Sequence, residues 1–139
     1  MIEPSLALQQ AIRERLAGNA LVLALVGAEN IRDGATRPDQ FPSIIVGDGQ
    51  TVLEGDQYAG WLNVTVHNDI HIWTFEDGLS GAKAIVGTVW QALMPKLIVP
   101  GWQLTDGHHV EGVRYLRDPA QSHGHAVLSV SAFMSGAWE

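Results

Sequence analysis

The residues best suited to chemistry form the run His67-Asn68-Asp69-Ile70-His71. On an extended strand, side chains two residues apart point to the same face and lie about 6.5–7 Å apart. His67, Asp69 and His71 would therefore share one face, and two imidazoles with a carboxylate can bind zinc or iron. No pattern of residues that would orient such metal ligands, and no catalytic-acid pattern, accompanies them. The run therefore favours a polar strand face without a metal, and leaves a small His/Asp metal-dependent enzyme as the alternative.

Other catalytic patterns are weaker. Ser80 lies in Gly-Leu-Ser-Gly-Ala, which lacks the glycine spacing of a nucleophile elbow, so it is interpreted as a helix cap. The run Gly47-Asp48-Gly49 is not followed by a helical pattern, as a phosphate-binding loop would be. The five tryptophans are scattered along the chain, and burial at interfaces is the common use of such residues. We expect no catalytic residue and no cofactor, and hence no enzyme.

Composition narrows the class further. A chain of 139 residues is long enough for one domain, spanning residues 1–139, and 46% apolar residues can build its core. The absence of cysteine excludes disulfides and thiolate chemistry. A formal charge of −7 argues against a protein that grips nucleic acid, because such proteins carry a basic surface.

Nothing in the sequence indicates a membrane segment. Residues 1–4 lack the basic and apolar regions of a signal peptide. The most apolar run, residues 20–28, is far shorter than the roughly 20 residues that span a bilayer. We therefore expect a soluble product without a membrane partner.

Two stretches have helical periodicity. The first begins at Pro4 with Ser5 as its expected cap and ends at Gly18, after which Asn19 is expected to cap a short second helix. The other begins near Ser80 and ends at Pro95. Gly81 and Gly87 inside it predict a close approach of this helix to a sheet, since glycine is unfavourable within helices.

Alternating or continuous apolar runs predict the strands. The clearest, residues 62–73, is interrupted by Asn68-Asp69, which suggests a bulge or bend. Asp106-Gly107 is expected to form a hairpin turn between two later strands. The predicted strands cover residues 43–47, 62–73, 102–105, 110–116 and 126–134.

The order of helix, strands, helix and strands predicts an α+β fold. Its sheet would be antiparallel or mixed, with helices packed on one face. The other face, which bears Thr, Ser, His and Trp, would meet solvent or a neighbouring subunit.

Residues 48–60 predict a protruding arm. They include the acidic residues Asp48, Glu54 and Asp56, no Lys or Arg, and three glycines that disfavour rigid local structure. An arm of this kind in a ring could line a lumen or dock on a partner. Docking is favoured because a water-filled channel would leave the apolar residues exposed. These apolar residues are Val52, Leu53 and Tyr58.

Several stretches together resemble the tail terminator, or tail-completion, proteins of long-tailed phages and of the gene transfer agents of alphaproteobacteria. The resemblance covers nearly the whole chain in the right order, and departs from the family around residues 52–63 and 95–102. The order of the motifs is the specific feature, since no single motif is specific. The matching stretches are the helix at residues 6–17, Phe41-Pro42 with the strand to Gly47, Ile70-His71-Ile72-Trp73, the helix at residues 82–87, the run Arg114-Tyr115-Leu116-Arg117-Asp118-Pro119, His123-Gly124, and the strand at residues 126–133.

The resemblance implies a structural virion protein. It would form a homo-hexameric ring at the tail–neck junction, assembled in the cytoplasm of the bacterial host. The ring would dock on the major tail-tube protein, stop its polymerisation and meet the neck connector or stopper protein, while DNA passes through the lumen without specific binding. Another neck or tail-tube component is the alternative. Arg114, Arg117 and Asp118 are expected to serve subunit contacts or loop ordering, with a solvated turn as the alternative.

Overall fold

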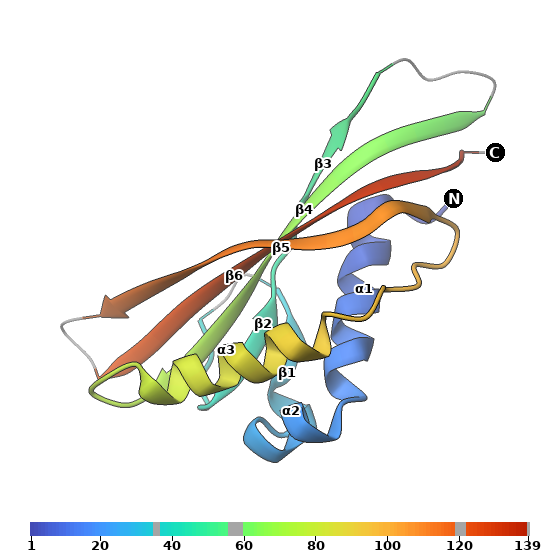
Figure 1. Cartoon of the computed structure of the whole chain (residues 1–139). Coiled ribbons are helices and arrows are strands. Elements are labelled where there is room, and N and C mark those ends of the chain that lie inside the picture. The colour runs from blue at the N-terminus through green and yellow to red at the C-terminus, as the bar shows by residue number, and fades with distance from the viewer. Residues whose placement is uncertain (35–36, 56–59, 119–121, 139) are drawn as a thin grey trace.

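The computed structural model describes residues 1–34, 37–55, 60–118 and 122–138, and for Asp118 the backbone alone. They form a six-stranded sheet with three α-helices and one short 3-10 helix (Figure 1). The elements in chain order are α1 (Pro4–Ala17), α2 (Ala20–Leu25), η1 (Ala28–Asn30), β1 (Ile31–Asp33), β2 (Ser43–Val46), β3 (Gln50–Leu53), β4 (Trp61–Phe75), α3 (Ser80–Ala92), β5 (Gln103–Asp118) and β6 (His123–Ala137).

The sheet is mixed, with strand order β1-β2-β4-β6-β5. β4 pairs with β6 along its whole length, and β5 pairs with the far edge of β6. β2 and β3 pair one after the other with the remaining edge of β4, and β1 runs parallel to β2. The predicted α+β class and mixed sheet are therefore confirmed.

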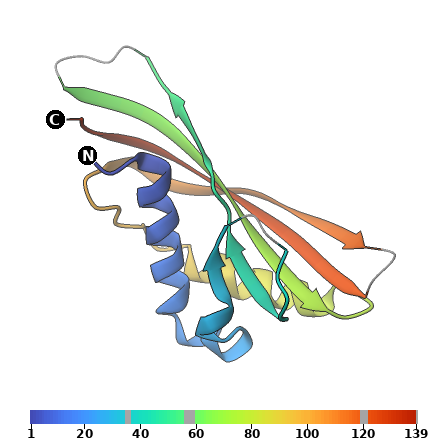
Figure 2. The same ribbon diagram turned by 180° about the vertical axis from the view of Figure 1, so that it is seen from behind.

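The helices lie on one face of this sheet, as expected (Figures 1 and 2). Alternation along β4 places residues such as Val66 and Ile70 under the helices and leaves the intervening residues on the other face. The core is completed by apolar residues of α1 and α3 and by the matching face of β6. No helix in the described part of the chain is long and apolar enough to cross a membrane. The largest buried side chains include Leu8, Ile12, Leu16, Ile44, Ile70, Ile72, Leu93, Leu128 and Met134.

Side chains that the sequence did not predict hold both ends of α1. Its cap is Glu3, whose carboxylate accepts from the Ser5 amide at 2.5 Å, so the expected cap at Ser5 is wrong. A carboxylate does the same work as a hydroxyl there and also opposes the positive end of the helix dipole. Near the other end, Arg15 donates to the carbonyl of the last residue of α3 and to two carbonyls that follow the helix. Asn19 caps α2 as predicted, accepting from two amides at 3.0 and 3.1 Å.

The start of α3 is capped from outside the helix. The carboxylate of Glu76 accepts from the Gly81 and Ala82 amides at 2.9 Å each, so the expected cap at Ser80 is wrong. Burial raises the pKa of Glu76, but hydrogen bonds from Thr74 and these two amides together lower it below its ordinary value.

The two glycines of α3 do not mark a close approach to the sheet. A Cβ at Gly81 would lie 2.7 Å from the Glu76 carboxylate, so a side chain rather than the sheet requires glycine there. A Cβ at Gly87 would meet no atom of the described residues within 4 Å. The prediction for Gly87 is therefore wrong in this subunit.

The predicted turn at Asp106-Gly107 and the predicted bulge at Asn68 both differ from the structure. Asp106-Gly107 is not a hairpin turn but a bulge inside the single strand β5, where both residues have positive φ and the register shifts. Asn68 causes no bulge in β4, whose register with β6 is unbroken there. The irregularity lies on the neighbouring edge instead, between β2 and β3.

The predicted arm is partly ordered as a strand. Gln50–Leu53 pairs with β4, which corrects the expectation that its glycines prevent a rigid local structure. The β3–β4 end of the sheet projects beyond the helices, close to both chain termini (Figures 1 and 2). Asp56 and Tyr58 of this arm lie outside the described residues.

Candidate functional site

The sheet face away from the helices is the open face. Strand register places outward side chains of β4, β6 and β5 in rows across it, for example His71 beside Val127 and Arg114. The described side chains of β4 on this face are half-buried, except those at its two ends. The open face comprises Thr65, His67, Asp69, His71 and Trp73 of β4, His125, Val127, Ser129, Ser131 and Phe133 of β6, and His109 and Arg114 of β5.

Two histidines of the open face, near the C-terminal end of β4, form an uncharged aromatic stack. Nδ1 of His71 lies 2.9 Å from Nε2 of His125, and the Trp73 ring stacks on His125 at 3.8 Å between centroids. Burial lowers the pKa of His125 to about 4, helped by the charges of His71, Arg37 and Arg114. Burial also lowers the pKa of His71, against the opposing effect of Asp69. Both rings are therefore neutral near pH 7.

The predicted metal ligands do not converge. His71 bonds to His125, whereas Asp69 accepts from the Ser129 hydroxyl at 2.7 Å. The other Asp69 oxygen lies 3.8 Å from Nη2 of Arg114. Within the described ranges, no three His, Cys, Asp or Glu side chains gather to hold a metal ion. Thus the geometry does not favour the metal-dependent alternative.

One end of the open face is covered by the segment before β2. The Phe41 ring stacks on His123 at 4.4 Å and lies 6.4 Å from Phe75. Arg37 contacts His123 and lies over the Trp73 ring at 5.3 Å. The Phe41-Pro42 motif therefore fixes this segment against the C-terminal end of β4.

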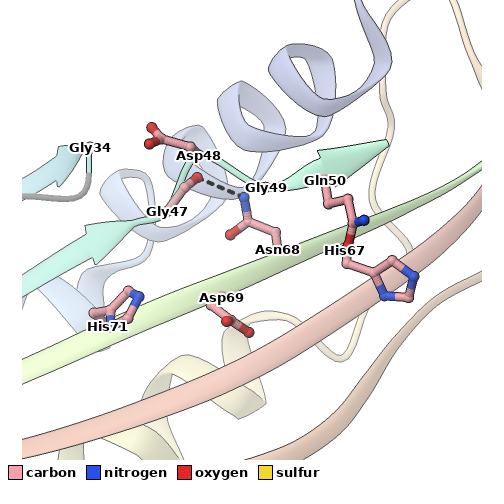
Figure 3. A pocket seen from close by; sticks show the side chains of 9 residues that line it. All are labelled: Gly34, Gly47, Asp48, Gly49, Gln50, His67, Asn68, Asp69 and His71. Carbon is pink, nitrogen blue, oxygen red and sulfur yellow. Dashed lines mark hydrogen bonds between the residues drawn. The ribbon is translucent and has the colours of Figure 1, made fainter. Parts of the chain in front are cut away.

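A hollow of about 420 Å³ opens at the break between β2 and β3, and we call it the notch (Figure 3). Glycines permit the break, because a Cβ at Gly47 would lie 2.7 Å from the Asp69 carbonyl. Gly49 has a φ of 81°, which favours glycine. The notch is lined by Gly34, Gly47, Asp48, Gly49, Gln50, His67, Asn68, Asp69 and His71.

Asn68 occupies the floor of the break, between the Gly47–Gly49 segment and β4 (Figure 3). Its side-chain amide donates to the Gly47 carbonyl at 2.9 Å, while its Oδ1 is buried without a hydrogen-bond partner among the described residues. The notch was missed in the sequence. The available signal was a Gly-x-Gly pair together with a polar residue at an otherwise apolar position of β4.

The predicted contact residues on β5 point to different faces. Arg114 lies on the open face, and its side chain is 64% exposed. Arg117 pairs with Gly124 on the helix-covered side and donates to the Asp77 carbonyl. The backbone of Asp118 pairs with His123, and its side chain lies outside the described part. The structure therefore does not bring the two arginines together.

The predicted arm residues also lie on different faces of the sheet. Val52 faces the same side as Thr65, and Leu53, on the other side, is 61% exposed. Glu54 accepts from the Thr65 hydroxyl at 2.9 Å. This end of the sheet therefore presents both apolar and acidic side chains.

Comparison with known proteins agrees with the resemblance seen in the sequence. The family profile described as "Tail completion protein gp17" matches residues 10–135. A chain in the virion of a native gene transfer agent particle is similar in structure, with a TM-score of 0.78, 22% identity, and coverage of 93% of this chain and 95% of that chain.

The gp17 protein of bacteriophage SPP1 is also similar, with a TM-score of 0.57, 20% identity, and coverage of 94% of this chain and 90% of that chain. At these identities the two structures establish a shared fold. No curated protein matches the sequence. Because the family profile spans most of the sequence, this chain belongs to the tail completion protein gp17 family, whose members are structural proteins of phage tails.

Proposed function

We propose that the protein forms a ring that caps the tail tube, ends its polymerisation and joins the tail to the head connector. The match of residues 10–135 to the tail completion family is the observation that carries this proposal. The ring would hold six copies at the tail–neck junction of the virion, after assembly in the cytoplasm of the bacterial host.

The shape of the subunit supports a ring. Its sheet has two unlike edges, β5 on one side and β1 with β3 on the other. Contacts between unlike surfaces repeat head to tail and close into a ring when the rotation permits. The half-buried open face adds polar and aromatic side chains such as Trp73 and Phe133, a composition that suits contact with another protein.

The charge supports a passage for DNA that does not bind it. Each subunit carries a formal −7, so six copies carry about −42 by multiplication (six times −7). Like charges oppose the phosphate backbone, which allows DNA to pass through the lumen without specific binding.

The β3–β4 end is the proposed docking arm. Leu53 is largely exposed there although it is apolar, and Val52 and Glu54 lie beside it. Docking against the major tail-tube protein or the neck protein would cover this apolar area. Asp56 and Tyr58 belong to the same proposed contact. Arg114, Arg117 and Asp118 are proposed to contact the neighbouring subunit or to order the loop after β5.

Deletion of residues 52–59 tests this function, because none of the described residues in this range belongs to the buried core. The expected result is a folded subunit and particles with tails of uncontrolled length or heads that fail to join. Normal infectious particles would contradict docking by the arm. Deletion of the whole gene separates the proposed cap from a tube subunit. Loss of a cap leaves tubes that grow too long, whereas loss of a tube subunit leaves no tube.

A further inference from the structure

The notch carries hydrogen-bond acceptors that have no donor. Asp48 has no ion-pair or hydrogen-bond partner for its side chain within the described ranges. Asn68 is only 2% exposed, and no group in the described part of the chain donates to its Oδ1. Buried oxygens without donors are rare in folded proteins and cost free energy. Asn68 Oδ1 is therefore an acceptor to which no described group of the subunit donates, and the exposed carboxylate of Asp48 lies with it in the notch.

The chemistry of the lining favours a guanidinium group. Two carboxylates, those of Asp48 and Asp69, and the carboxamide oxygen of Asn68 all line the notch. Among the described residues, a cation lies beside only one of these carboxylates, since Arg114 of the same chain is 3.8 Å from Asp69. The described ranges hold no set of three side chains suited to a metal ion. A planar group with several donors can satisfy acceptors that point from different elements.

The opposite edge strand of the same subunit, β5, carries such a group, and its side chain reaches back across the open face to Asp69 of β4. Arg114 on β5 is mostly exposed, and its ion pair with Asp69 is long. Exposed pairs of this kind contribute little to stability, so the guanidinium is free to exchange its partner. Strand register places Arg114 level with Val127 and His71, and His71 lines the notch. Copies joined edge to edge without sliding would bring Arg114 to the level of the next notch.

We propose that the notch of one copy receives Arg114 of the adjacent copy, whose guanidinium binds Asp48 and the free oxygen of Asn68. This inference rests on the proposed ring and assigns the contact between its subunits. The contact is head to tail, because the notch lies at the β1–β3 edge and Arg114 on the β5 edge. Repetition of this contact around an axis uses each notch and each Arg114 once.

Complementary charge reversal tests the contact. The notch variant is Asp48→Arg and the edge variant is Arg114→Glu. Tail tubes that lack this protein receive one variant alone or an equimolar mixture of both. Each variant alone should cap at most about one tenth as many tubes as the wild type, because like charges would meet at every contact. An equimolar mixture should restore capping, since a ring of six can alternate the variants and pair opposite charges at every contact.

Matched variants control for charge alone. Asp39→Arg and Lys96→Glu reverse exposed charges outside the notch and the β5 edge, and both should cap as the wild type does. Circular dichroism should show that all variants are folded. Normal capping by Asp48→Arg or Arg114→Glu alone, or no recovery in the mixture, would overturn the notch contact while the ring stands. Failure of the wild type to cap tubes would instead contradict the proposed function.

Discussion

Replacement of Arg15 by methionine should destabilise the fold by releasing the C-terminal end of α3. Nη1 of Arg15 donates to the Ala92 and Pro95 carbonyls at 3.0 and 2.8 Å, and Nη2 donates to the Lys96 carbonyl at 3.0 Å. These carbonyls lack partners within the helix, and a cation there also interacts favourably with the helix dipole. Methionine keeps the apolar stem and removes all three bonds.

The magnitude follows from the exposure of the bonds. The bond to Ala92 is part-buried and the other two are exposed. A hydrogen bond to a charged group contributes about 1.5–3 kcal/mol when buried and less at the surface, so we expect a loss of about 2 kcal/mol. For 139 residues, an unfolding entropy of about 2.1 cal/mol/K per residue converts this to a fall in Tm of about 7 °C.

Urea unfolding followed by tryptophan fluorescence and circular dichroism measures the change. Arg13→Met is the matched control, because Arg13 lies on the same helix and its one ion pair within the described ranges is a 3.5 Å exposed pair with Asp33. That pair is worth less than about 1 kcal/mol. Arg15→Lys, which keeps the charge without the planar fork, should fall between the two. Equal stability of Arg15→Met and Arg13→Met would refute the role of Arg15 in holding α1 to α3.

Three further predictions follow from the described contacts. The folded pKa of Glu76 is lowered, so its capping stabilises the fold above the ordinary carboxyl pKa and this stabilisation is lost as pH falls through the folded value. Urea titrations should show that Glu76→Gln loses the full unfolding free energy of the cap at pH 7, and that this loss shrinks below about pH 4.5. The folded His125 binds fewer protons than the unfolded chain between pH 6.5 and about 4, so stability should decrease as the pH is lowered through this window, and should decrease less in His125→Phe. NMR titration of a His125 ring with an ordinary pKa would contradict this. Gly87→Ala should raise the free energy of unfolding by about 0.5–1 kcal/mol, since its Cβ meets open space, whereas Gly81→Ala should lower it by displacing the Glu76 carboxylate; thermal unfolding that shows the two changing in the same direction would contradict this.

Long periodic segments were predictable from the sequence because the period itself encodes burial. Alternation along residues 62–73 predicted β4 and its two faces, and apolar residues at helical spacing predicted α1 and α3. The glycine at position 18 and the cap at Asn19 are local features, and both were placed correctly. The family resemblance supplied the class of protein, which no spacing of residues could have given.

The errors arose where a partner distant in the sequence decides the structure. Asp106-Gly107 suits a hairpin turn and a bulge equally, since both need positive φ, and only continuous pairing with β6 selects the bulge. The caps Glu3 and Glu76 were missed because the prediction looked for a hydroxyl at the first helical residue. The notch depends on β2 and β3 meeting one edge of β4, a pairing that local patterns do not specify.

A reconstruction of the assembled particle by electron cryomicroscopy, at a resolution that traces this chain, tests the central claim most directly. The account predicts one ring of six copies of this chain between the last ring of the tail tube and the neck. Copies repeated along the whole tube, or a ring of three or twelve at the junction, would contradict it.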